Sequence, residues 1–113
     1  IEIIYGLRNF IGNAVKYSRN KIYLTLKSNN NQTEIIIEDD GVGYPKDILS
    51  KIGEPYLKTL NEDMKEKSGL GLGLFIGKTL LEKNFASIIC RNSKTRNGAE
   101  VIIKWNNKDL FSL

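Results

Sequence analysis

Residues 67–83 read KSGLGLGLFIGKTLLEK. Its glycines, Gly69, Gly71 and Gly73, alternate with Leu70, Leu72 and Leu74. Glycine costs conformational entropy unless the backbone needs special angles or a close approach to another group. The leucines can pack inward, while the unpaired amides and the dipole at a helix N-terminus attract an anion. The stretch therefore predicts a glycine turn opening a helix over about 71–83, with phosphate held by main-chain amides.

Two better-known phosphate motifs do not fit this stretch. The sequence Gly77-Lys78-Thr79 suggests a P-loop, but that motif needs a glycine where Leu72 stands, and it should follow a strand. Lys78 is expected on the solvated side of a helix. A dinucleotide fingerprint needs an acidic residue about 20 residues further on, and 91–96 (RNSKTR) has none.

Hydrophobic periodicity predicts an α+β protein of one domain, residues 1–113. Helices are expected at 1–18, 46–52 and 71–83, and strands at 21–27, 33–38, 86–92 and 99–105. The order of helices and strands is not a strict βαβ alternation, which favours a two-layer sandwich with helices on one face of a sheet. The polar segment 53–68 is longer than most connections, and residues 106–113 are expected to be a tail.

Side-chain spacing also predicts which faces are buried. The first helix should bury Ile4, Leu7, Ile11, Ala14 and Val15 on one face. Alternation places Ile22, Leu24 and Leu26 on one side of the first strand. Three consecutive isoleucines at 35–37 suggest that the second strand is buried on both faces.

Composition limits the classes of function. Seventeen basic and 13 acidic residues give a net charge of +4, which suits an anionic ligand, but the basic residues are too scattered to indicate nucleic acid. The chain has no apolar run of membrane-spanning length, so no direct membrane contact is expected. The lone Cys90 reads as a buried strand residue. The absence of histidine excludes histidine bases, histidine metal ligands and Ser-His-Asp triads.

Two further clusters carry polar side chains in suggestive patterns. Asn9 and Asn13 lie one helical turn apart, with Lys16 on the same side. A carboxamide oxygen can ligate Mg²⁺, although such asparagines alone are more typical of a solvated helix face. Asp39 ends a strand in Asp-x-Gly-x-Gly, with Gly41 and Gly43, and its carboxylate could accept an adenine amine. Taken alone, that sequence is a plain turn.

In this order, the three motifs resemble the ATP-binding domain of the GHKL superfamily, which includes histidine kinases, gyrases, Hsp90 and MutL-type proteins. NAVKYS resembles the N box of a bacterial sensor histidine kinase, and GEPYLKT resembles its F box, with Gly53 where the family often has phenylalanine. The combination is most similar to the redox-responsive RegB/PrrB group. The resemblance implies the Bergerat fold, with a mixed sheet and an N-terminal strand that this sequence does not show.

The resemblance also implies a role for individual residues. Asn13 would ligate Mg²⁺ with Asn9 beside it, Lys16 would touch phosphate, and Asp39 would bind adenine. Segment 53–68 would be the ATP lid, from which Lys58, Lys65 or Lys67 would reach the γ-phosphate. The remaining nucleotide contacts implied are Tyr17, Gly41, Gly43, Tyr56, Gly69, Leu70, Gly71, Leu72 and Gly73.

The implied activity is transfer of the γ-phosphate of ATP to a histidine on a separate dimerisation domain, with a response regulator receiver domain as the later partner. Hydrolysing members carry a glutamate where this chain has Asn9, so water is poorly activated here. The domain is expected in the cytoplasm, with a parent anchored in the bacterial inner membrane. Two alternatives stay open: a serine kinase of the anti-sigma type, and a degenerate nucleotide-binding regulatory module.

Overall fold

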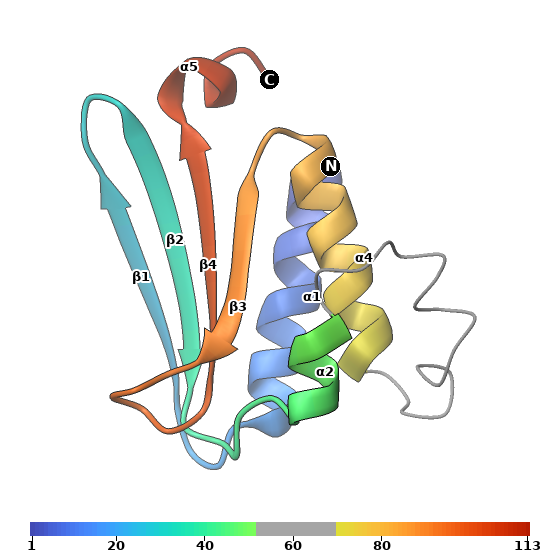
Figure 1. Cartoon of the computed structure of the whole chain (residues 1–113). Coiled ribbons are helices and arrows are strands. Elements are labelled where there is room, and N and C mark those ends of the chain that lie inside the picture. Colours follow the sequence, from blue (N-terminus) through green and yellow to red (C-terminus); the bar gives the residue numbers. More distant parts are fainter. Residues whose placement is uncertain (52–69) are drawn as a thin grey trace.

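A computed structural model describes residues 1–51 and 70–113 (Figure 1). Its elements are α1 (Glu2–Tyr17), β1 (Ile22–Ser28), β2 (Gln32–Asp39), α2 (Lys46–Lys51), α4 (Leu70–Lys83), β3 (Ser87–Asn92), β4 (Ala99–Asn106) and α5 (Asn107–Leu110). Every predicted helix and strand is present, with bounds that differ by one residue in most cases. The predicted long connection, 53–68, lies outside the described residues.

The four strands form one sheet in the order β1-β2-β4-β3. All three strand pairings are antiparallel, so the expectation of a mixed sheet is not met by the described strands. The pairs β1–β2 and β3–β4 are consecutive hairpins, and hairpins are antiparallel because a tight turn reverses the chain. Asn97 has φ 70° in the second turn, as the predicted Asn-Gly pair favours.

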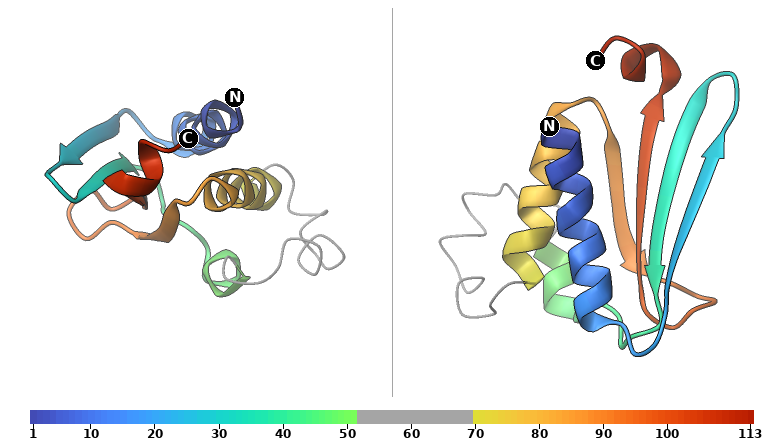
Figure 2. Two further views of the ribbon diagram at one scale, coloured as in Figure 1. Left: turned by 90° about the horizontal axis from the view of Figure 1, so that it is seen from above. Right: turned by 180° about the vertical axis from the view of Figure 1, so that it is seen from behind.

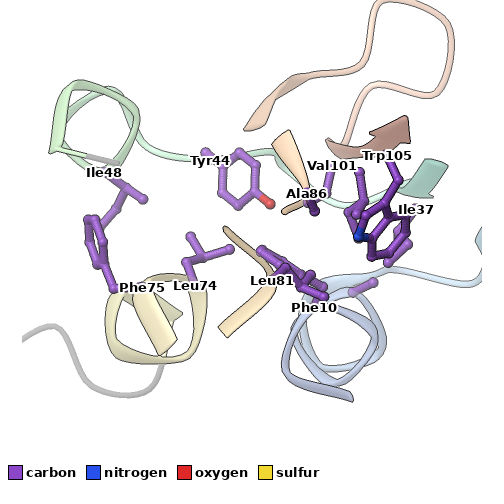
Figure 3. Close-up of a cluster of buried hydrophobic side chains, with 12 residues drawn as sticks. Phe10, Ile37, Tyr44, Ile48, Leu74, Phe75, Leu81, Ala86, Val101 and Trp105 are labelled. Carbon is purple, nitrogen blue, oxygen red and sulfur yellow. The ribbon is translucent and has the colours of Figure 1, made fainter. Parts of the chain in front are cut away.

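Both long helices cover one face of the sheet, which gives the two layers seen in Figure 2. The core between them contains side chains from α1, α2, α4 and the inner strands, and Figure 3 shows most of them. Phe10, Leu74, Leu81 and Ile103 are at most 1% exposed. The predicted α+β sandwich, with helices on one face, is therefore confirmed.

Burial of the strands follows their position in the sheet. Ile36 and Ile37 point to opposite faces of β2 and are both buried, which confirms burial on both sides of a central strand. Leu24 and Leu26 face the helix side, because they pair with Ile37 and Ile35. They are nevertheless 58% and 70% exposed, since β1 is the edge strand farthest from the helices in Figure 1.

The buried face of α1 agrees with the predicted one in part. Gly6, Phe10 and Ala14 are its buried residues, and Leu7 and Ile11 pack partly buried against the core. Ile4 and Val15 were predicted on the same face but are 60% and 59% exposed. The predicted stripe omitted Gly6 and Phe10, which contact α4, and was therefore centred to one side of the buried face.

The predicted C-terminal tail contains a helix. Asn107 begins α5, and its amide donates to the carbonyl oxygen of Asn29 at 2.7 Å and accepts from the Thr33 hydroxyl at 2.6 Å. These contacts fix the end of β4 to the β1–β2 turn. Within residues 1–51 and 70–113, no helix is both long and apolar enough to cross a membrane.

Candidate functional site

A cavity of about 170 Å³ opens between α1, the end of β2 and the start of β4. Its lining is mainly apolar, with few polar side chains that could orient a ligand. The lining residues are Phe10, Asn13, Ala14, Tyr17, Ile37, Asp39, Val42, Gly43, Tyr44, Pro45, Ala99 and Val101. Three of the sequence motifs thus contribute to, or border, one apolar pocket of the kind that binds small ligands.

Asp39 is the buried carboxylate of this pocket, with 4% of its surface exposed. Its Oδ1 accepts hydrogen bonds from the N–H of Gly41 at 2.8 Å and from the N–H of Ala99 at 3.3 Å. Among the described residues, no hydrogen bond to Oδ2 is formed. Two main-chain donors therefore fix the carboxylate through one oxygen and leave the other as an acceptor for a ligand.

The glycines around Asp39 make close backbone contacts. A Cβ on Gly41 would collide with the carbonyl oxygen of Tyr17, and a Cβ on Gly98 would collide with Oδ1 of Asp39. Gly41 thus brings the pocket loop, residues 40–45, against the end of α1. Gly98 was missed as a site residue because its Asn-Gly sequence signals only a hairpin turn.

Asn13 also lines the pocket. Its Nδ2 is buried and has no hydrogen-bond partner within the part of the chain that the structure describes. A Cβ added at Gly73 of α4 would lie 3.2 Å from Nδ2 and 3.4 Å from Oδ1. An unpaired buried amide is costly, so this group is suited to a ligand.

Two predicted residues of α1, Asn9 and Lys16, are not among the residues that line the pocket. Asn9 donates from Nδ2 to the carbonyl oxygen of Tyr5 at 2.8 Å, within its own helix. The Lys16 ammonium lies 5.3 Å from the centre of the Tyr17 ring and is on the exposed side of the helix. The structure therefore brings together Asn13, Tyr17, Asp39 and Gly43, with Gly41 behind them, but not Asn9 or Lys16.

The glycine stretch opens a helix, as predicted. Because α4 begins at Leu70, one residue before the predicted start, Gly71 and Gly73 belong to the first turn of the helix, and Leu72 lies between them. The first four N–H groups of a helix have no partner within it, so amides remain available beside Asn13. Tyr56, Lys58, Lys65, Lys67 and Gly69 lie outside the described residues.

Tyr44 is a pocket residue that the sequence did not reveal, although it directly follows Asp-x-Gly-x-Gly. Burial raises the pKa of its hydroxyl, with a further contribution from Cys90. Burial likewise raises the pKa of the Cys90 thiol to about 12. Cys90 lies in β3 and packs, partly buried, against the core, which confirms it as a packed strand residue.

Lys78 does not approach the pocket. Its ammonium pairs with the Glu82 carboxylate at 3.0 Å along α4. In residues 1–51 and 70–113, no group of three or more histidine, cysteine, aspartate or glutamate side chains could hold a metal ion. A metal in this pocket would therefore need oxygen ligands of other kinds, such as a carboxamide oxygen or the oxygens of a bound ligand.

Comparisons with known proteins agree with this geometry. A family profile described as "Histidine kinase-, DNA gyrase B-, and HSP90-like ATPase" matches residues 2–109. The sensor histidine kinase RegB of Cereibacter sphaeroides is 38% identical over 97 residues, which cover 81% of this chain and 21% of RegB. The sensor protein kinase PilS of Pseudomonas aeruginosa is 33% identical over 99 residues, 81% of this chain and 18% of PilS.

A solved structure has the same fold. Full-length ShkA in complex with AMPPNP superposes with a TM-score of 0.66 at 26% identity, covering 92% of this chain and 21% of ShkA. The chain thus spans about a fifth of the length of these relatives. The predicted resemblance to histidine kinases, and to the RegB group in particular, is confirmed. The chain belongs to the histidine kinase-, DNA gyrase B- and HSP90-like ATPase family.

Proposed function

We propose that this chain binds Mg-ATP in the pocket beside Asp39 and serves as the catalytic domain of a sensor histidine kinase. The observation that carries the proposal is the buried Asp39 carboxylate, held by two main-chain donors on Oδ1. A fixed carboxylate oxygen accepts a hydrogen bond from the exocyclic amine of adenine. Guanine has a carbonyl oxygen at that position, which an acceptor repels.

The apolar walls of the pocket suit a flat base. Ile37 of β2 and Val101 of β4 line it from the sheet, Tyr17 lines it from the end of α1, and Val42 lines it from the pocket loop. Burial of apolar surface supplies affinity, while the single carboxylate supplies selectivity. The AMPPNP complex of ShkA supports the same class of ligand for this chain.

Asn13 fits a magnesium ion bound with a triphosphate. Its buried Nδ2 has no hydrogen-bond partner among the described residues, and its Oδ1 is the atom that could ligate the metal. Mg²⁺ commonly takes one or two protein oxygens and completes its shell with phosphate oxygens and water. The ion would neutralise charge on the phosphates. The free amides at the start of α4, including those of Gly71 and Gly73, would face the phosphate chain. Lys16 lies on the solvent side, and its ammonium would reach phosphate only if the side chain turned away from the Tyr17 ring.

The same helix argues for phosphate transfer over hydrolysis. A general base for water would be expected one turn before Asn13, where Asn9 stands. An amide cannot accept a proton from water, and the Asn9 amide is already bonded to the carbonyl oxygen of Tyr5. The site therefore suits an external nucleophile that supplies its own base.

The acceptor lies outside this sequence, which contains no histidine. The relatives are sensor kinases, which supports a histidine-bearing dimerisation domain of the same parent as acceptor and a response regulator receiver domain as the next partner. It also supports a cytoplasmic location for this domain, in a parent anchored in the bacterial inner membrane.

The test is transfer of labelled phosphate from ATP to the parent's dimerisation domain. Acid-labile label on that domain, with none on this chain, is the expected result. Label on this chain would contradict the assignment. Acid-stable phosphoserine on a partner protein would instead establish the anti-sigma type of kinase, and binding without transfer would establish a regulatory module.

A further inference from the structure

Asn92, the last residue of β3, holds the pocket loop through both ends of its amide. Its Oδ1 accepts a hydrogen bond from the N–H of Tyr44 at 2.7 Å, and its Nδ2 donates to the carbonyl oxygen of Tyr44 at 3.3 Å. One side chain thus satisfies both main-chain groups of a residue 48 positions away. Among the described residues, no other hydrogen bond to these two Tyr44 groups is formed.

The residue that Asn92 holds is part of the pocket wall. Tyr44 is 7% exposed, and Figure 3 shows its ring among core side chains, between Ile48 of α2 and Val101 of β4. Val42, Gly43, Tyr44 and Pro45 all line the cavity. A shift of the Tyr44 backbone would therefore change the shape of the pocket directly.

Gly43 makes this contact possible. Its φ is +82°, a conformation that side chains disfavour. A Cβ at Gly43 would also lie only 2.6 Å from Oδ1 of Asn92 and 3.0 Å from its Cγ. The second glycine of Asp-x-Gly-x-Gly thus makes room for Asn92, and not only for a ligand as the sequence suggested.

The same corner of the sheet also fixes Asp39. Asn92 pairs with Ala99 across β3 and β4, and the N–H of Ala99 donates to Oδ1 of Asp39. The carboxylate and the loop that faces it are therefore both positioned from this one strand pair. The distance between the Asp39 carboxylate and the pocket loop therefore depends on the two hydrogen bonds to Asp39 and the two hydrogen bonds to Tyr44.

We infer that Asn92 is a positioning residue for nucleotide binding, which acts by holding the pocket loop at the correct distance from Asp39. This inference rests on the proposed function. Asn92 itself is exposed, so truncating it removes two hydrogen bonds without opening a cavity in the core. The alternative is that Asn92 contributes only to the stability of the fold.

Asn107 provides a matched control for that alternative. It also uses both ends of its amide to hold a distant turn, through Asn29 and Thr33, and it is 7% exposed. It lies next to α5, at the end of the sheet away from the pocket loop (Figure 1). Truncation of Asn107 removes similar bonds but leaves the pocket walls in place.

The test measures the affinity of a non-hydrolysable ATP analogue and the melting temperature for the unmodified chain, Asn92→Ala, Asn92→Asp and Asn107→Ala. Asn92→Ala should weaken binding about fivefold or more, because it removes two hydrogen bonds from the pocket wall. Asn92→Asp keeps the acceptor for Tyr44 and should recover part of the affinity. Asn107→Ala should lower the melting temperature at least as much and leave affinity unchanged.

Two results would overturn the inference alone. Unchanged affinity in Asn92→Ala, with binding by the unmodified chain intact, would leave the proposed function standing without this role. Equal losses of affinity in Asn92→Ala and Asn107→Ala would show that Asn92 acts only through stability. Absence of binding by the unmodified chain would overturn the proposed function and this inference together.

Discussion

Gly6 of α1 and Gly77 of α4 face each other at the crossing of the two long helices. A Cβ on Gly6 would lie 3.2 Å from the carbonyl oxygen of Gly77 and 2.7 Å from Cγ of Leu81. A Cβ on Gly77 would lie 3.2 Å from the carbonyl oxygen of Gly6 and 2.9 Å from Cε2 of Phe10. This close approach brings α1, which carries Asn13, against α4, which carries Gly73.

Alanine at either position should therefore destabilise the protein. In a helix, alanine is favoured over glycine by about 1 kcal/mol, but overpacking costs about 1–3 kcal/mol. Gly6→Ala and Gly77→Ala are expected to lower the free energy of unfolding, as measured by urea titration. Gly12→Ala is the control, because nothing lies within 4 Å of an added Cβ there. It should gain about 1 kcal/mol, and an equal gain in Gly6→Ala would contradict the tight crossing.

These contacts also show where prediction from sequence stops. Periodicity located the helices and strands, because each apolar repeat is a local property of the chain. The buried face of α1 was predicted only in part, because the burial of Gly6 and Phe10 depends on Leu81 and Gly77 in another helix. Leu24 and Leu26 were placed on the correct side of β1, but their exposure depends on β1 being an edge strand.

The residues of the candidate site likewise divide into those that a local sequence motif predicts and those that depend on contacts with distant residues. Asp39, Gly41, Gly43 and Asn13 could be predicted because they belong to compact motifs with a chemical reason for each residue. Asn92 could not, because its partner Tyr44 is 48 residues away and an asparagine at a strand end carries no local signal. Asn9 and Lys16 were grouped with Asn13 by helical spacing and by the family resemblance, but Asn9 bonds within its own helix and Lys16 is exposed.

Phe85 ends α4 in a conformation that normally favours glycine. Its φ is 72°, and its N–H bonds to the carbonyl oxygen of Glu82 while the N–H of Ala86 bonds to that of Leu81. This is the Schellman arrangement, in which glycine is preferred at the left-handed position. Phe85 is 61% exposed, so its side chain adds little packing.

Phe85→Gly should accordingly raise the free energy of unfolding by about 1 kcal/mol, which is the approximate cost of a left-handed conformation for a residue with a Cβ. Phe85→Ala is the matched control, because it removes the ring and keeps the Cβ. Thermal unfolding of both variants separates the two effects. Equal stability of the glycine and alanine variants would show that backbone conformation does not limit stability here.

Asp40 connects the end of β2 to the turn after α1. Its carboxylate accepts hydrogen bonds from the N–H groups of Arg19, Asn20 and Lys21. These donors, that of Asn20 foremost, lower the pKa of Asp40 below its usual value of 3.8. The folded state therefore binds this proton less readily than the unfolded state does.

The stabilisation from Asp40 should be complete above pH 3.8 and should be lost as the pH falls through the lowered pKa. Asp40→Asn cannot titrate, so the difference in unfolding free energy between it and the unmodified chain should shrink toward acid pH. Urea unfolding across that range measures the difference. A difference that does not depend on pH would refute the role of the ionised carboxylate.

Asn13 should determine the effect of magnesium on nucleotide affinity. In the unmodified chain, Mg²⁺ is expected to strengthen binding of an ATP analogue, because the Asn13 oxygen would help to hold an ion that neutralises charge on the phosphates. Asn13→Ala should remove most of that increase and change the affinity without metal much less. Titrations in Mg²⁺ and in chelator provide the comparison. A full magnesium effect in Asn13→Ala would place the ion elsewhere.

The central claim is that the fixed carboxylate of Asp39 binds adenine. The most direct measurement is calorimetric titration of the unmodified chain and of Asp39→Asn with a non-hydrolysable ATP analogue in Mg²⁺. Asparagine is isosteric and can still accept the Gly41 and Ala99 bonds at Oδ1, but its NH₂ group would then meet the adenine amine, donor against donor. The account predicts binding by the unmodified chain and at least about tenfold weaker binding by Asp39→Asn, at equal melting temperature. Equal affinities would contradict it.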